Sequence, residues 1–208
     1  MKIILALAAL VITFAMPVHA GLDEGTAAYA RGDYAAALKE LRPLAEQGDA
    51  RAQFTLGLMY EKGQGVAKDE PEAAKWYRKA ADSGYARAQI NLAAMYGQGR
   101  GVARDVTEGV KWIRKAAEQG DAEAQGMLGG MYLNGVGVAK DEVEAVKWIR
   151  KAADQGNAGA QDLLAGVYAK GRGVARDDVE AVKWLRKAAD QGDANAQFNP
   201  CLSGLLPK

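Results

Sequence analysis

The four tryptophans of this 208-residue chain are spaced 36 residues apart, at Trp76, Trp112, Trp148 and Trp184. Set out at that period, the chain gives four units that align without insertion: 50–85, 86–121, 122–157 and 158–193. A fixed period between about 20 and 50 residues is typical of solenoids, in which each repeat is one supersecondary unit. The period therefore predicts a stack of repeats before any local propensity is considered.

Each unit is predicted to contain two helices. In the first helix of a unit, called helix one, Ala52, Leu56 and Met59 fall on one apolar face. Small residues recur beside that face and would let a neighbouring helix approach closely: Gly57, Ala93, Gly129 and Ala165. A glycine-rich loop such as GQGVAKD follows, and its first glycine suits the left-handed conformation that commonly ends a helix.

The second helix of a unit, called helix two, begins with an aspartate that precedes a glutamate by three residues, as in Asp69 and Glu72. This is a capping-box pattern with Asp as the cap, and it occurs in all four units. The tryptophans lie at the core spacing of helix two, so we expect them to fill the space between repeats rather than to stack on a ligand. The predicted fold is all-α, a right-handed α/α superhelical solenoid of stacked helix-turn-helix repeats.

The first twenty residues are predicted to be a signal peptide. Lys2 precedes an uninterrupted apolar run over residues 3–16, and Pro17 and small residues lead to a predicted cut after Ala20. The run is shorter than the roughly twenty residues that span a bilayer, so stable membrane insertion after cleavage is not expected. The mature protein is therefore expected to be periplasmic or secreted.

Two segments flank the four units. Residues 21–49 resemble a shortened unit without the glycine-rich loop and are expected to form an N-terminal capping hairpin. Residues 194–208 begin a fifth helix one, but Pro200 interrupts it, which predicts an incomplete C-terminal cap. The chain is expected to be a monomer, and Cys201 leaves open a disulfide-linked dimer.

Composition limits the chemistry that this chain can perform. The single histidine, His19, falls in the predicted signal peptide, and serine occurs only at Ser83 and Ser203. Without histidine the mature chain offers neither a Ser-His-Asp triad nor a histidine metal ligand. Loss of Lys2 leaves 26 basic and 26 acidic side chains, a balance that disfavours nucleic acid as a partner. We expect no enzyme activity, no catalytic residue, no metal and no cofactor.

The repeated motif A-x-A-Q-x-x-L-G-x-M-Y, followed by G-x-G-V-x-x-D and A-x-x-W, resembles the Sel-one-like repeat (SLR), a relative of the tetratricopeptide repeat. The resemblance covers residues 50–193 in full and implies a scaffold or adaptor, as in many exported bacterial members. One cysteine-rich branch of the family is linked to β-lactam binding or hydrolysis. The repeats of this chain contain no cysteine, which makes that branch a poor match.

The resemblance also implies that helix one lines the inside of the superhelix. Comparing the four units shows which helix-one positions change, and their spacing of 4, 3 and 4 residues places them in one stripe. We hypothesise that this stripe, with Phe54, Ile90, Gly126 and Asp162 beside it, binds a protein or peptide partner. The stripe consists of Arg51, Thr55, Leu58, Lys62, Arg87, Asn91, Ala94, Gln98, Glu123, Met127, Gly130, Asn134, Gly159, Leu163, Gly166 and Lys170.

Three alternatives stay open at this stage. The stripe positions could vary simply because they face water and tolerate change. The recurring set Lys75, Arg78 and Lys79 could form a basic ladder, although pairing of Arg78 with Asp82 would make it a solvated outer face. Against the leading hypothesis of an exported, non-enzymatic scaffold stands the alternative of β-lactam or peptidoglycan-fragment binding, which location and family alone suggest.

Overall fold

The structure is a computed structural model that describes residues 18–192, with side chains from residue 21. This part of the chain forms ten helices and contains no strand, which confirms the predicted all-α solenoid class. The helices are α1 (Val18–Ala30), α2 (Tyr34–Glu46), α3 (Ala50–Lys62), α4 (Glu70–Asp82), α5 (Ala86–Gln98), α6 (Val106–Glu118), α7 (Ala122–Asn134), α8 (Glu142–Asp154), α9 (Ala158–Lys170) and α10 (Asp178–Asp190).

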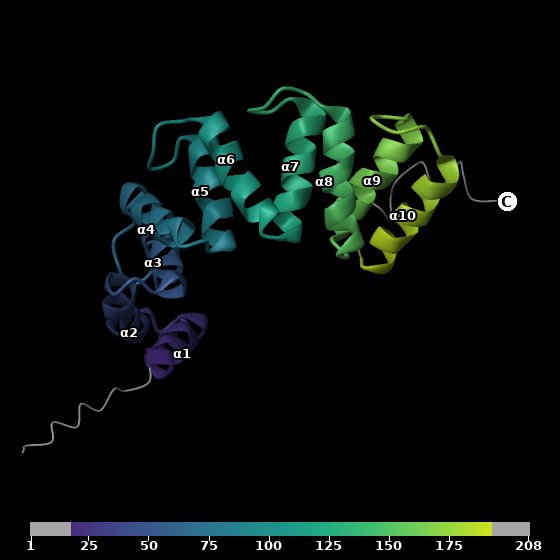
Figure 1. Ribbon diagram of the computed structural model, residues 1–208. Coiled ribbons are helices and arrows are strands. Elements are labelled where there is room, and N and C mark those ends of the chain that lie inside the picture. Colours follow the sequence, from purple (N-terminus) through teal and green to yellow (C-terminus); the bar gives the residue numbers. More distant parts are fainter. Residues whose placement is uncertain (1–17, 193–208) are drawn as a thin grey trace, which may run out of the picture.

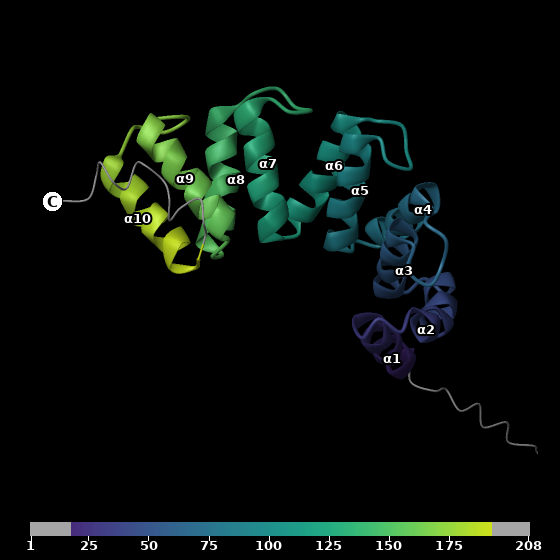
Figure 2. The ribbon, with the colours of Figure 1, turned by 180° about the vertical axis from the view of Figure 1, so that it is seen from behind.

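The helices pack as successive hairpins along a curved row, with α1 at one end and α10 at the other (Figure 1). Helix one of the four units corresponds to α3, α5, α7 and α9, and helix two to α4, α6, α8 and α10. In Figures 1 and 2 the long loops between α5 and α6 and between α7 and α8 lie on the outer side of the row. Each helix contacts its neighbours in sequence, so the buried side chains form clusters that continue from one hairpin to the next.

The predicted capping box is only half formed. The carboxylate of Asp69 accepts a hydrogen bond from the backbone nitrogen of Glu72 at 2.9 Å, and the same contact recurs at the other three helix-two starts. The reciprocal contact, in which the glutamate side chain accepts a hydrogen bond from the backbone nitrogen of the capping aspartate, does not form. That part of the prediction is wrong. The Asp69 nitrogen already donates to the carbonyl of Tyr60 at 2.9 Å. Glu72 is therefore free to bind Lys75, also at 2.9 Å.

The small residues of helix one have the predicted steric role. A Cβ atom at Gly57 would lie 2.5 Å from the ring of Tyr77, and one at Gly129 would lie 2.4 Å from Ile149. Such distances are far below van der Waals contact. Helix two of each of these units therefore packs against its own helix one only because these side chains are missing.

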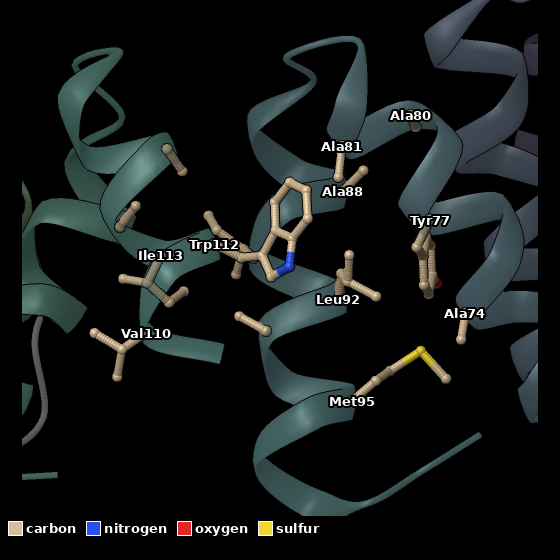
Figure 3. Packing of buried hydrophobic residues seen from close by; sticks show 14 of the residues in the cluster. Ala74, Tyr77, Ala80, Ala81, Ala88, Leu92, Met95, Val110, Trp112 and Ile113 are labelled. Carbon is tan, nitrogen blue, oxygen red and sulfur yellow. The ribbon is translucent and has the colours of Figure 1, made fainter. Parts of the chain in front are cut away.

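The tryptophans occupy the interior, as their spacing predicts, but not uniformly. Trp112 is 3% exposed and lies beside Ala81, Ala88 and Leu92 of the two preceding helices (Figure 3). The ring of Trp112 also carries the Lys115 ammonium 3.7 Å from its centroid, and Lys79, Lys151 and Lys187 lie in the same way over the other three tryptophans. Lysine thus covers one face of each indole ring.

Two kinds of hydrogen bond recur at the repeat boundaries. Arginines of α2, α4, α6 and α8 donate to the tyrosine hydroxyl of the following helix one, as in Arg114 to Tyr132 at 2.6 Å. A buried glutamine near the start of each helix one donates to a carbonyl of the preceding helix two, as in Gln89 to Ala81 at 3.0 Å. The expected pairing of Arg78 with Asp82 does not form, because Arg78 binds Tyr96 instead.

Most of the predicted signal peptide and the predicted C-terminal cap lie outside the described residues. Helix α1 begins at Val18 and so runs across the predicted cleavage point after Ala20. Residues 1–17 of the predicted signal peptide, Pro200, Cys201 and the rest of the predicted cap over residues 194–208 lie outside the described residues. Between residues 18 and 192, no helix combines the length and the apolar character needed to cross a bilayer.

Candidate interaction surface

The surface of α3, α5, α7 and α9 that carries the predicted stripe is called here the helix-one face. Its residues at both ends of each helix are exposed: Arg51, Lys62, Arg87, Gln98, Glu123, Asn134, Gly159 and Lys170. Its central residues are half-buried: Leu58, Asn91, Ala94, Met127, Gly130, Leu163 and Gly166. The helix-one face therefore has charged or polar edges and a recessed, mostly apolar centre.

Some predicted residues of the stripe contribute little accessible surface. Thr55 is only 6% exposed, and its hydroxyl donates to the carbonyl of Arg51 at 2.8 Å. Ile90 belongs to the buried core, and the ring of Phe54 lies 5.1 Å from that of Tyr85 and 5.8 Å from that of Tyr77. Thr55 and Ile90 therefore support the packing of the helix-one face, whereas Phe54 is half-buried like the central residues of that face.

The opposite surface, on helix two, repeats the same contacts from unit to unit. Lys75, Lys111, Lys147 and Lys183 each bind the glutamate three residues earlier at 2.8–2.9 Å. Lysines such as Lys79 and Lys115 lie over tryptophan rings, and arginines such as Arg114 bind tyrosine hydroxyls. Most basic residues of helix two are therefore occupied by contacts within the solenoid. Arg186 is the exception among the described residues, since it is exposed and has no such contact.

Between α3 and α5, the space beneath the helix-one face is filled by a polar cluster. Tyr77 is fully buried, and its hydroxyl donates to Glu61 at 2.6 Å. The other carboxylate oxygen of Glu61 accepts from Arg100 at 2.7 Å, and the two side chains are 19% and 34% exposed. Arg100 also donates to Gln98 of the stripe at 2.7 Å.

The protonation of this cluster follows from its contacts. Burial alone would raise the pKa of the Glu61 carboxyl, but the hydrogen bonds from Tyr77 and Arg100 outweigh burial and hold that pKa below its ordinary value. The pKa of the Tyr77 phenol is raised, first by burial and then by the hydrogen bond to Glu61. The cluster is therefore a carboxylate, a neutral phenol and a guanidinium at neutral pH.

Between α7 and α9, the corresponding space is partly empty. Leu133 takes the place of Glu61, and a cavity of about 70 Å³ is lined by Leu133, Leu163, Gly166, Val167, Lys170 and Arg172. Arg172 donates to the carbonyl of Leu133 at 2.8 Å and to Glu142 at 2.9 Å. This arginine closes one end of the cavity and satisfies a backbone carbonyl at the end of α7.

Sequence comparison of the units missed Glu61, Arg100, Leu133 and Arg172, which shape the space beneath the face. The signal was available, because the positions of these residues also change between units: Glu61, Gly97, Leu133 and Ala169 in one set, and Gln64, Arg100, Val136 and Arg172 in the other. These positions lie outside the stripe, whose members are spaced by 4, 3 and 4 residues.

The arrangement of potential metal ligands is a further property of the described residues. Over the part of the chain from residue 18 to residue 192, no three histidine, cysteine, aspartate or glutamate side chains gather as metal ligands would. The carboxylates of this part largely cap helices or pair with lysine and arginine.

The family model and the solved structures that match this chain agree with one another. A family profile described as the Sel1 repeat matches residues 50–85, 86–121, 122–157 and 158–193. The structure is similar to that of a Sel1 repeat protein from Oxalobacter formigenes, with 37% identity and a TM-score of 0.81, over 86% of this chain and 71% of that one. No functionally curated protein matches the sequence.

A second similar structure is a protective antigen with an SLR fold present in uropathogenic Escherichia coli strains, at 42% identity and a TM-score of 0.82. The match covers 87% of this chain but only 40% of the antigen. A Sel1 repeat protein from Klebsiella pneumoniae shares the fold at 23% identity and a TM-score of 0.55, over 88% and 92% of the two chains. Proteins with this fold are generally non-catalytic interaction scaffolds. With four matched repeats and these relatives, the chain belongs to the Sel1 repeat family.

Proposed function

We propose that this protein is an exported, non-enzymatic scaffold that binds a protein or peptide partner on its helix-one face. The observation that carries the proposal is the contrast between the two surfaces of the solenoid. On helix two the basic side chains recur from unit to unit and most of them are paired within the fold, as Lys75 is with Glu72 at 2.9 Å. Those of helix one change in size and charge from unit to unit, as from Arg51 and Arg87 to Glu123 and Gly159.

The chemistry of the helix-one face fits a polypeptide ligand. Its recessed centre offers apolar contact through Leu58, Met127 and Leu163, while charged residues lie at its edges. Protein interfaces commonly combine an apolar centre with a polar rim. Arg87 and Lys62 have no ion-pair partner in the described part of the chain and are free to pair with a ligand.

A crosslinking experiment in cells of the native host would test the surface. A photoreactive amino acid placed at Arg87 or Gln98 lies on the helix-one face, and the same amino acid at Thr107 or Val143 is a matched control on exposed positions of helix two. We expect a discrete crosslinked species from the helix-one positions alone. Equal crosslinking from both surfaces, or none from helix one, would contradict the proposal.

Charge reversal gives an independent check. The double variant Arg51→Glu with Arg87→Glu should reduce the crosslinked species while leaving the melting curve unchanged. Both side chains are exposed, and among the described residues the only ion pair that either forms is between Arg51 and Asp23 at 3.6 Å. Exposed pairs of this kind contribute little to stability.

Export is the second part of the proposal, and the support for it comes from Lys2, the apolar run over residues 3–16 and the small residues before Gly21. The intact mass of the protein from periplasmic and culture fractions tests this part. We expect a chain that begins at Gly21. A protein that retains Lys2 and stays in the cytoplasmic fraction would contradict export without affecting the binding proposal.

A further inference from the structure

The cavity between α7 and α9 opens on the helix-one face and combines an apolar wall with a cationic rim. Leu133, Leu163 and Val167 form the wall, and Lys170 and Arg172 provide the positive charge. The cavity volume of about 70 Å³ exceeds the roughly 10–15 Å³ that one water molecule needs. There is space here for a small aliphatic side chain.

Gly166 opens the cavity, and packing gives no reason for a glycine at this position. A Cβ atom at Gly166 would meet no heavy atom within 4 Å, and the same holds at Gly130 on the neighbouring helix. Glycine in a helix interior is less stable than alanine. The glycines at positions 57 and 129, by contrast, are required by contacts with helix two. What Gly166 provides is access for a ligand to the cavity wall.

The charge at the rim is positive. Lys140 and Arg172 share the carboxylate of Glu142, each at 2.9 Å. Lys170 is exposed and forms no ion pair with any described residue. Arg172 is thus already paired with Glu142, whereas the ammonium of Lys170 is complementary to an acidic group on a ligand.

We propose that this cavity binds a peptide segment in which a small aliphatic residue is adjacent to an aspartate or glutamate. The aliphatic side chain fills the space beside Leu163 and Val167, and the carboxylate pairs with Lys170. The inference rests on the proposed function, because it specifies which part of the helix-one face anchors a polypeptide partner and what sequence the partner presents.

The experiment begins with a random library of twelve-residue peptides displayed on phage and selected on the purified mature chain. We expect enriched sequences to place valine, leucine or isoleucine next to aspartate or glutamate. One enriched peptide is then synthesised and titrated by calorimetry. Gly166→Leu, which fills the cavity, and Lys170→Glu, which reverses the rim charge, should each weaken binding at least tenfold.

Gly97 provides the matched control. It lies in the last turn of α5, away from the cavity, and a Cβ atom there would also meet nothing within 4 Å. Gly97→Leu should therefore leave the affinity unchanged. The melting temperatures of both leucine variants should be equal to or above that of the parent, since neither position is sterically restricted.

The outcomes separate this inference from the proposed function. Peptides without the aliphatic–acidic pair, or equal losses from Gly166→Leu and Gly97→Leu, would overturn the inference. Peptides whose binding is lost only with Arg51→Glu and Arg87→Glu would also overturn it, while the proposed function would stand. A selection without enrichment, together with no crosslink from helix one, would refute both.

Discussion

The space between α3 and α5 and the equivalent space between α7 and α9 have the same backbone environment but different contents. In the first, Glu61 fills the gap and binds both Tyr77 at 2.6 Å and Arg100 at 2.7 Å. In the second, Leu133 cannot bind the arginine through its side chain, so Arg172 binds the Leu133 carbonyl at 2.8 Å and a cavity remains. The comparison shows how a repeat can keep its backbone while a few substituted positions decide whether the surface is filled or open: Leu133 for Glu61, Ile149 for Tyr77 and Gly166 for Ala94.

A second difference separates the tryptophans of the first two units from those of the last two units. The indole nitrogens of Trp76 and Trp112 are buried without a hydrogen-bond partner. Those of Trp148 and Trp184 donate to the glutamate four residues earlier, at 2.9 and 3.0 Å. Burial does not explain the difference, because Trp184 is 6% exposed and Trp76 is 8% exposed.

The largest effect on stability is expected from truncating Trp112 in the second unit. Trp112→Ala should cost about 3–5 kcal/mol of unfolding free energy, because the ring is 3% exposed and surrounded by α4 and α5. Trp148→Ala should cost less, since that ring is half-buried. Urea unfolding followed by circular dichroism measures both. A loss below about 1 kcal/mol for Trp112→Ala would mean that the ring is not a core residue.

The polar cluster should give the next largest effect. Glu61→Leu copies the residue found at position 133 and leaves Arg100 unpaired and the Tyr77 hydroxyl without its carboxylate acceptor. We expect a loss of about 1–3 kcal/mol, the usual cost of an unsatisfied buried polar group. The same urea experiment applies. A neutral result would show that the cluster contributes to the surface but not to stability.

The stabilisation from Glu61 should depend on pH. Its pKa is lowered in the folded state, so its contribution is present above the unfolded-state pKa and is lost as the pH falls through the folded-state value. The difference in stability between the parent and Glu61→Leu should thus be full near neutral pH and shrink below about pH 4. Chemical unfolding at a series of pH values tests this. A difference that grows on acidification would contradict the assigned charge state.

A smaller, favourable effect is expected from a substitution within the first unit. Gln119, Gln155 and Gln191 donate to the buried glutamines of their own units at 2.7–2.9 Å. Ser83 occupies the equivalent place in the first unit, and the side-chain oxygen of Gln53 has no partner. Ser83→Gln should restore the bond and add about 1 kcal/mol. An unchanged melting temperature would indicate that water already satisfies Gln53.

The smallest effect is expected at Tyr85, which replaces the capping residue found in the other units and leaves α5 without a side-chain cap. Tyr85→Asp should add a cap worth about 1 kcal/mol and remove a ring contact with Phe54 worth about as much. We expect a net change near zero in the parent. In a Phe54→Ala background the same substitution should stabilise the protein, and the absence of that gain would contradict the balance.

Much of the architecture was predictable from the sequence. The 36-residue period, the recurring glycines and the aspartates at 69, 105, 141 and 177 predicted the repeat boundaries and the starts of helix two. These features are local, because a left-handed turn or a helix cap depends on a few adjacent residues. Gly57 and Gly129 were also predictable, because one missing Cβ atom has the same consequence wherever the unit recurs.

What the tertiary structure alone decided was which residues share each space between units. Glu61 and Arg100 are 39 residues apart, as are Leu133 and Arg172, and no local rule distinguishes a filled gap from an open one. The structure likewise buried Thr55 and Ile90 and assigned Arg78 to Tyr96 rather than to Asp82. The sequence by itself determined the repeating unit, because caps, turns and close packing are short-range. The surface depended on the stacking, because volume and charge there are shared by side chains from different units.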